Sequence, residues 1–199
     1  MKTEQLHELL YQALETEAGG VQVYETAIRC AVNEDLKQEW QHYLEQTRTH
    51  EQLLRRLFET MGLDPARDTP GRRIVRHKGE SLVEGMKMAL KANNASAAQL
   101  VAAECVVTAE TKDHQNWELL SQVAGKLQGE HGKALKEACE QIEDQEDQHL
   151  YHSMGWTREL WIESLGLPAV LPPPEEEKDV KSAGEAAQAK QSREQMVRR

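Results

Sequence analysis

An apolar row in the last third of the chain has the spacing of an α-helix, and two ionisable residues occupy positions in that row. Leu135, Cys139 and Ile142 are separated by four and three residues, as are side chains that share one face of a helix. The same row continues through Glu146 and His149. Burying a carboxylate and an imidazole is costly unless they pair with each other or bind a metal. The row therefore predicts a helix whose buried face carries a polar pair that needs partners.

The spacing of Glu146 and His149 also has a chemical meaning. Residues three apart lie about one turn from each other on one face of a helix, which is the Glu-x-x-His geometry of carboxylate-bridged metal sites in four-helix bundles. The motif alone is weak, because acidic-x-x-His also occurs at 4–7 and 39–42. Only the pair at 146–149 continues an apolar row away from a chain end. The alternatives are a buried ion pair and a slight rotation of the helix that exposes both side chains.

The composition is typical of an all-helical protein. Glycine, with 12 of 199 residues, and proline, with 6, are sparse until the end of the chain, and aromatic residues make up 5%. One domain of this length buries enough apolar surface to fold without disulfides. The three cysteines fall one each on three expected helices, so free thiols and a reducing compartment are expected.

Charge and hydropathy argue against two classes of partner. The formal net charge of -10 disfavours binding to nucleic acid, which requires an excess of Lys and Arg. The first ten residues, MKTEQLHELL, lack the apolar core of a signal peptide, and no run approaches the roughly 20 apolar residues of a membrane span. We therefore expect a cytoplasmic protein that binds neither nucleic acid nor membrane.

Apolar rows of helical spacing predict four long helices. The expected ranges are 3–32, 35–61, 93–127 and 129–154, the last with an alternative end near residue 166. Gly19 and Gly20 interrupt the first of these at a cost of about 1 kcal/mol each, which indicates a local bend or the close approach of another helix.

The remaining segments are predicted to connect or follow these helices. Residues 63–79 contain two prolines and an excess of Lys and Arg, which predicts a long crossover loop, and a short helix at 80–92 would follow it. The helical domain would then occupy residues 1–166. Residues 167–199 are rich in proline and then poor in apolar residues, which predicts a disordered tail.

The two halves of the helical domain resemble each other. Glu17 falls on the apolar row of the first helix and is followed seven residues later by Tyr24, and Glu110 is followed seven residues later by Trp117. We interpret this repeat as the same arrangement in each half: a buried glutamate, and an aromatic residue seven positions later that packs in the core. His114, four residues after Glu110, is expected to be partly exposed, and the alternatives are a metal ligand or a residue that orients one.

Antiparallel pairing within each half would bring these polar residues to one level. A turn after the first helix places Glu17 opposite His50, and Glu51 is the next residue. His50 and Glu51 are therefore both candidates for a ligand from the second helix. A turn after the third long helix places Glu110 within one residue of Glu146. Core-face polar residues of four helices thus converge, which favours a shared site over chance.

This set of residues resembles a known family. Glu17, Glu110 and the Glu146-x-x-His149 pair, on four long helices with a crossover between hairpins, resemble the ferritin-like carboxylate di-iron superfamily. Within it the chain is most similar to the bacterial stress-associated ferritin-like proteins of the YciF type, and more distantly to rubrerythrins. The resemblance implies a ferritin-like four-helix bundle made of two antiparallel helical hairpins, with a dinuclear iron or manganese centre in its core.

The resulting hypothesis is a di-iron protein, with manganese or zinc as alternative metals. Glu110 would bridge the metals, and Glu17, Glu146 and His149 would be terminal ligands. Such a centre would react with oxygen or peroxide, so the expected activity is iron oxidation or peroxide removal in stress defence. The protein is expected to be a homodimer.

One position departs from the family pattern, because the second helix carries Thr47-x-x-His50 where a Glu-x-x-His pair is expected. This departure keeps open a rival from a different class, a non-catalytic helical interaction protein that has lost the metal. An iron-storing cage is a third alternative, for which no interface pattern is seen.

Overall fold

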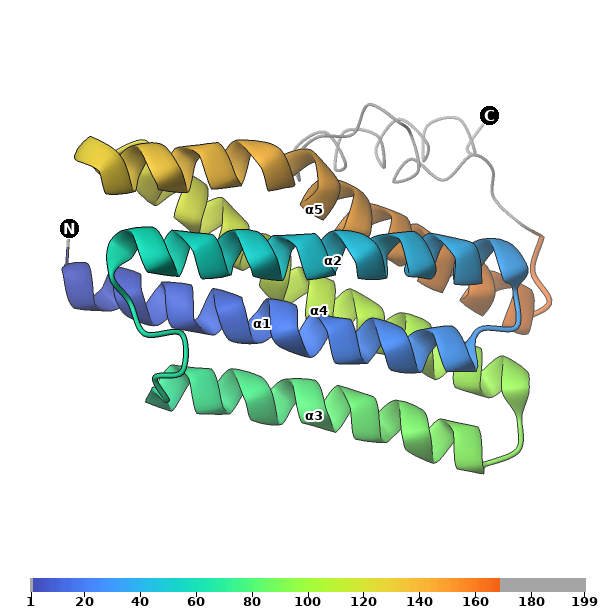
Figure 1. The fold of residues 1–199 in the computed structure, drawn as a ribbon. Helices are drawn as coiled ribbons and strands as arrows, with labels where there is room; N and C mark the ends of the chain where they lie inside the picture. Colours follow the sequence, from blue (N-terminus) through green and yellow to red (C-terminus); the bar gives the residue numbers. More distant parts are fainter. Residues whose placement is uncertain (1, 169–199) are drawn as a thin grey trace, which may run out of the picture.

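The structure is a computed structural model that describes residues 2–168, and α-helices account for most of them (Figure 1). The helices are α1 (Thr3–Cys30), α2 (Glu34–Met61), α3 (Pro70–Lys91), α4 (Ala95–Ala124) and α5 (Gly129–Ser164). No strand occurs within residues 2–168, so the all-α prediction is confirmed. The predicted tail, apart from its first two residues, lies outside the described residues.

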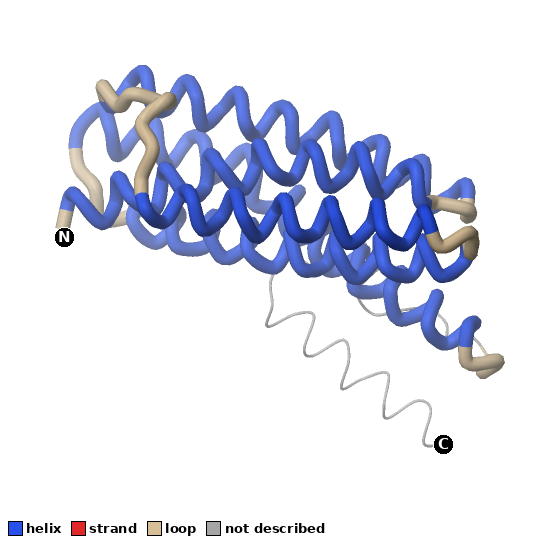
Figure 2. Tube along the Cα trace, turned by 90° about the horizontal axis from the view of Figure 1, so that it is seen from below, coloured by secondary structure: helices blue, strands red, loops and turns tan. Residues whose placement is uncertain are grey.

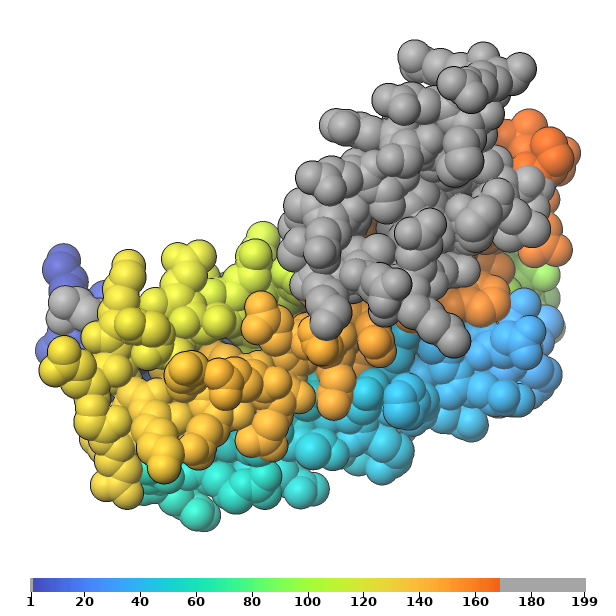
Figure 3. Space-filling view, turned by 90° about the horizontal axis from the view of Figure 1, so that it is seen from above, coloured from blue at the N-terminus to red at the C-terminus, as the bar shows by residue number. Residues whose placement is uncertain are grey.

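The helices lie side by side along one long axis (Figures 1 and 2). α2 runs back along α1, and α5 runs back along α4. The two pairs meet where α1 packs against α4 and α2 packs against α5, and the space-filling view shows α5 alongside α2 at the surface (Figure 3). α3 packs on the outside of α1 and α4. Four helices therefore enclose the centre of the molecule and the fifth covers one seam.

The crossover between the two pairs is a helix, and the prediction of a loop over residues 63–79 is wrong from residue 70 onward. α3 begins at Pro70, directly after Thr69, whose side chain accepts a hydrogen bond from the backbone N–H of Arg72. Proline is favoured in the first turn of a helix because its missing N–H has no partner there. The proline therefore starts the crossover helix, which continues without interruption through the predicted short helix at 80–92.

Turn chemistry sets the ends of the other helices. The side chain of Asn33 caps α2 and that of Asn94 caps α4, by accepting hydrogen bonds from backbone N–H groups of the first turn. Gly62 ends α2 with a φ of 65°, the left-handed conformation that glycine adopts most easily. α5 continues beyond residue 154 to Ser164, in agreement with the longer of the two predicted ends.

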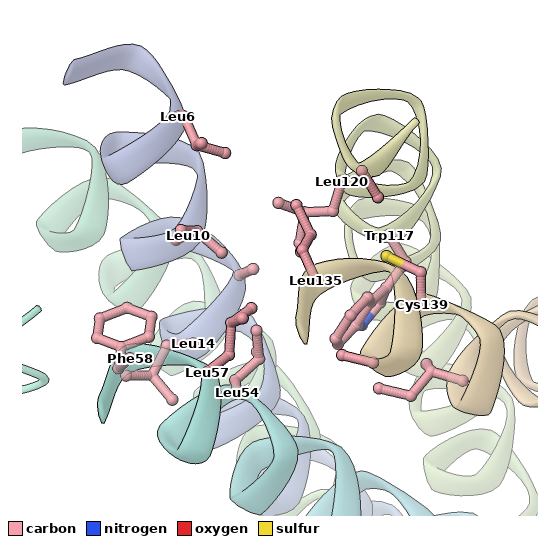
Figure 4. Packing of buried hydrophobic residues seen from close by; sticks show 14 of the residues in the cluster. Leu6, Leu10, Leu14, Leu54, Leu57, Phe58, Trp117, Leu120, Leu135 and Cys139 are labelled. Carbon is pink, nitrogen blue, oxygen red and sulfur yellow. The ribbon is translucent and has the colours of Figure 1, made fainter. Parts of the chain in front are cut away.

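Two apolar clusters fill the interior, one toward each end of the helices. The first contains Leu10, Phe58, Leu120 and Ile142 (Figure 4 shows members of this cluster), and the second contains Trp40 among others. Between these two clusters, most of the buried residues of α1, α2, α4 and α5 are polar. The fold therefore places a buried polar layer near the middle of a long apolar core. No helix within residues 2–168 is long and apolar enough to cross a membrane.

Candidate metal centre

Five of the six predicted site residues meet in the polar layer. Each of the four inner helices contributes at least one of them: Glu17 of α1, His50 of α2, Glu110 of α4, and Glu146 and His149 of α5. All five residues are at most 3% exposed. These residues are separated by up to 132 positions in the sequence, so only the packing of the helices brings them together.

The donor atoms form two groups that share one residue. Glu17, His50 and Glu146 make one group, and Glu110, Glu146 and His149 make the other, with the donor atoms of each group within 4.8 Å of one another. Both groups are fully buried. A carboxylate that belongs to two adjacent donor sets can contact two metal ions at once.

Distances show that Glu146 lies between the two imidazoles. Its Oε1 is 3.0 Å from Nδ1 of His50 and 3.8 Å from Nδ1 of His149. Glu17 approaches His50 Nδ1 at 3.6 Å, and Glu110 approaches His149 Nδ1 at 3.5 Å. Glu146 is therefore the shared carboxylate, whereas the sequence hypothesis gave the bridging role to Glu110.

Two glutamines fix the orientation of the imidazoles. Nε2 of His50 lies 2.8 Å from Oε1 of Gln145, and Nε2 of His149 lies 2.9 Å from Oε1 of Gln46. An amide oxygen only accepts hydrogen bonds, so Nε2 carries the hydrogen in both rings. Both Nδ1 atoms then face the carboxylates. Partners of this kind, which hold the far nitrogen of an imidazole, are typical of histidines that bind metal.

The glutamines have a sequence signal that was not recognised in the sequence hypothesis. Gln46 precedes His50 by four residues on α2, and Gln145 precedes His149 by four residues on α5. Each glutamine binds the histidine of the opposite helix. The repeat of the two halves therefore extends to the residues that orient the imidazoles.

Several donor atoms of the layer are buried without a hydrogen-bond partner. They are Glu17 Oε2, Glu110 Oε2, both carboxylate oxygens of Glu146, and His50 Nδ1, whose close approach to Glu146 lacks the alignment of a hydrogen bond. An unsatisfied buried polar atom costs about 1–3 kcal/mol. A metal ion between the carboxylates would satisfy these atoms together, so the residues present fit such a group.

Burial and mutual interaction shift the acid–base behaviour of the layer. Burial raises the pKa of Glu17 to about 7, although the neighbouring His50 opposes that rise. Burial lowers the pKa of His50, but Glu17 and Glu146 outweigh it and raise that pKa to about 11. Without metal the imidazole is therefore protonated and held by two carboxylates, and metal would have to displace the proton from Nδ1.

The aromatic residues of the internal repeat contact the carboxylates crosswise. Nε1 of Trp117 donates to Oε1 of Glu17 at 2.8 Å, so the α4 aromatic residue binds the α1 glutamate. Tyr24 of α1 is fully buried, and burial together with the adjacent Glu110 raises its pKa well above the usual value. Both aromatic residues pack around the layer as predicted.

Asp113 is a further buried carboxyl group that the sequence hypothesis missed. It lies three residues after Glu110 on the same face of α4, is 5% exposed, and has a buried Oδ1 without a partner. Burial and the charges of Glu17, Glu146 and Glu110 raise its pKa well above the usual value. The i, i+3 spacing from Glu110 was the signal that could have identified it. Asp113 belongs to neither donor group.

His114 is buried, in contrast to the prediction that it is partly exposed. Its Nε2 lies 2.7 Å from Oδ1 of Asp147, and this contact raises the pKa of His114. Asp147 directly follows Glu146, so its side chain leaves α5 on a different face. The pair therefore links α4 to α5 beside the layer.

The second helix contributes His50 but no carboxylate. Glu51 lies outside both donor groups and forms an ion pair with Arg55 at 2.6 Å. Thr47 is buried in the layer, and a Cβ added to Gly20 would lie 3.2 Å from its Cγ2. Thr47, packed closely against α1, therefore stands at the position where the resemblance leads us to expect a glutamate.

The chain was compared with protein-family models, with curated proteins and with solved structures, and none matches it. The side chains of the buried layer therefore carry the functional assignment. These side chains form carboxylate and imidazole groups that could hold a metal ion.

Proposed function

We propose that the polar layer binds two divalent metal ions, as in the ferritin-like four-helix proteins. Glu17 and His50 would hold one ion, and Glu110 and His149 the other, with Glu146 between them. The observation that carries the proposal is the pair of imidazoles whose Nε2 atoms are bound to glutamine, while both Nδ1 atoms face the shared carboxylate.

The donor set suits iron, which is the metal we propose. Carboxylate oxygens and imidazole nitrogens suit Fe, Mn and Zn, whereas iron–sulfur clusters and most structural zinc sites use thiolates. Neither donor group contains a cysteine. Zinc and manganese would bind the same atoms, so metal analysis has to distinguish the three.

When bound, a pair of iron ions supplies redox chemistry with oxygen or peroxide. The carboxylates would hold the positive charge, and the glutamines would keep the imidazoles in one orientation. The apolar clusters on both sides of the layer would keep bulk water from it. We propose iron oxidation or peroxide removal as the activity.

Metal stoichiometry tests this proposal. Full-length protein, stripped with a chelator, is titrated with Fe(II) in the absence of oxygen, and bound iron is counted after gel filtration. The wild type should bind two ions per chain, and Glu146→Gln should lose both because the shared carboxylate is gone. Glu143→Gln, an exposed position on the same helix, should bind as the wild type does. A wild type that binds no metal would exclude the proposed function.

The rival is a non-catalytic interaction protein that keeps the fold. The packing of Gly20 against Thr47 favours it, since α2 then lacks the carboxylate expected of a complete centre. This rival predicts that the buried layer is a network of ion pairs. It would be supported if Fe, Mn and Zn all left the stability of the protein unchanged.

A further inference from the structure

A pocket of about 500 Å³ opens between α1, α3 and α4, and its lining includes none of the proposed metal ligands. It lies where the crossover helix covers the seam between α1 and α4. Its volume falls in the range of about 300–1,000 Å³ that is typical of sites for small organic ligands. The pocket is thus large enough for a ligand of its own.

Gly19 keeps this pocket open. Consecutive glycines inside a helix cost about 1 kcal/mol each. Gly20 has a packing reason, because a Cβ there would press on Thr47. A Cβ on Gly19 would meet nothing within 4 Å, and Gly19 lines the pocket. The absence of a side chain at Gly19 therefore preserves space rather than relieving a clash.

The walls of the pocket are largely apolar. Val23 of α1, Val75 and Leu82 of α3, and Ala109 of α4 contribute aliphatic groups. Burial of an aliphatic chain among such groups is favourable at about 25 cal/mol per Å² of apolar surface removed from water. The walls therefore suit an unbranched hydrocarbon body.

The charge of the pocket is positive although the chain as a whole is acidic. Lys78 of α3 and Lys112 of α4 both line it. The ammonium group of Lys112 donates to the side-chain oxygen of Asn116. Within the described residues, the lysines that form ion pairs are Lys37, Lys133 and Lys136.

The one acidic residue of the lining is already neutralised. Glu15 binds Arg72 at 2.5 Å and Arg76 at 2.7 Å. It is therefore not available to Lys78 or Lys112. Two lysines in the lining of an apolar pocket would attract an anionic group.

We propose that this pocket binds an amphiphile with an unbranched aliphatic chain and a carboxylate head group. The chain lies between Val23, Val75 and Leu82, and the carboxylate meets Lys112 and Lys78. The lining includes none of the proposed metal ligands, so ligand binding to the pocket and metal binding can be measured separately.

Calorimetric titration of the full chain with decanoate tests the proposal. Decanoate should bind with one-to-one stoichiometry, and decanol should bind at least about tenfold more weakly because it lacks the charge. Lys112→Met, which keeps the length of the side chain, should weaken decanoate binding about tenfold, whereas Lys87→Met on the exposed face of α3 should not.

Filling the pocket gives a second, independent test. Gly19→Leu should abolish binding, because its side chain occupies the open space next to Val23. Gly85→Leu is the matched control: a Cβ there also meets nothing within 4 Å, but Gly85 does not line the pocket. Absence of saturable decanoate binding, equal binding of decanol, or unchanged binding to Gly19→Leu would each overturn the proposal.

Discussion

Gln145 of α5 binds Nε2 of His50 on α2, and the reciprocal contact joins Gln46 of α2 to His149 of α5. This exchange ties the two helices together at the level of the polar layer. It also turns both Nδ1 atoms toward Glu146. An ion-pair network needs only the close approach of opposite charges, whereas a metal site needs each imidazole in one fixed tautomer.

The glutamines should therefore control metal affinity although they do not touch the metal. Gln145→Met keeps the length of the side chain but removes the acceptor for His50. We expect metal affinity, measured by competition with a chelator, to fall about 10- to 100-fold. Gln141→Met, one turn away on the exposed side of α5, should leave the affinity unchanged. Equal affinities for the two variants would show that Gln145 has no orienting role.

Metal should stabilise the wild type more than a variant that lacks Glu110. At a free metal concentration one hundred times the dissociation constant, the free energy of unfolding should rise by about 2.7 kcal/mol for each ion bound. Glu110→Ala should lose the part of this gain that comes from the ion beside His149, as thermal unfolding would show. Its metal-free form should nevertheless be at least as stable as the wild type, because one of several repelling carboxylates is removed. Glu118→Ala, exposed on the same helix, is the control. A metal-free Glu110→Ala that is clearly destabilised would instead indicate a broken ion pair.

Asp113→Asn should stabilise the metal-free protein. The carboxyl has a buried oxygen without a partner, and its pKa is raised, so the folded state keeps a proton that the unfolded chain loses as pH rises. We expect a gain of about 1–3 kcal/mol in urea unfolding, larger at pH 9 than at pH 5. The same substitution would be destabilising if Asp113 accepted an essential hydrogen bond.

The metal-free protein should lose stability as pH rises. The pKa of Glu17 is raised to about 7 and that of His50 to about 11, so the folded state binds more protons than the unfolded chain from about pH 4.5 upward. The contribution of His50 to the free energy of unfolding is fully present below its unfolded pKa of about 6.5, and it is lost as pH rises through 11. Urea unfolding in a chelator should therefore show a higher free energy at pH 6 than at pH 9. In His50→Gln the free energy of unfolding should fall less steeply with pH. An unchanged dependence on pH would contradict the raised pKa of His50.

Much of the layer could be predicted from sequence because helical spacing is a local property. Glu17, Glu110, Glu146 and His149 interrupt apolar rows, and their burial follows from the rows themselves. Which of His50 and Glu51 faces the core depends on how α2 is rotated about its axis. The inward row that contains Thr47 also contains His50, so it favours His50.

Other features depended on contacts between helices that are distant in sequence. The crossover helix was missed because prolines were taken as breakers, although Pro70 stands in a first turn. The bridging role was assigned to Glu110 because spacing along α4 cannot show that Glu146 lies between both imidazoles. Asp113 belongs to no Glu-x-x-His pair, the pattern on which the sequence hypothesis depends.

The central claim is that Glu146 lies between two metal ions, and anomalous diffraction at the iron edge tests it most directly. Crystals of the full chain would be soaked with Fe(II) without oxygen. We predict two anomalous peaks in contact with Glu146, one beside Nδ1 of His50 and the other beside Nδ1 of His149. A polar layer without any peak, or peaks bound only at the surface, would contradict the account and leave the buried residues as an ion-pair network.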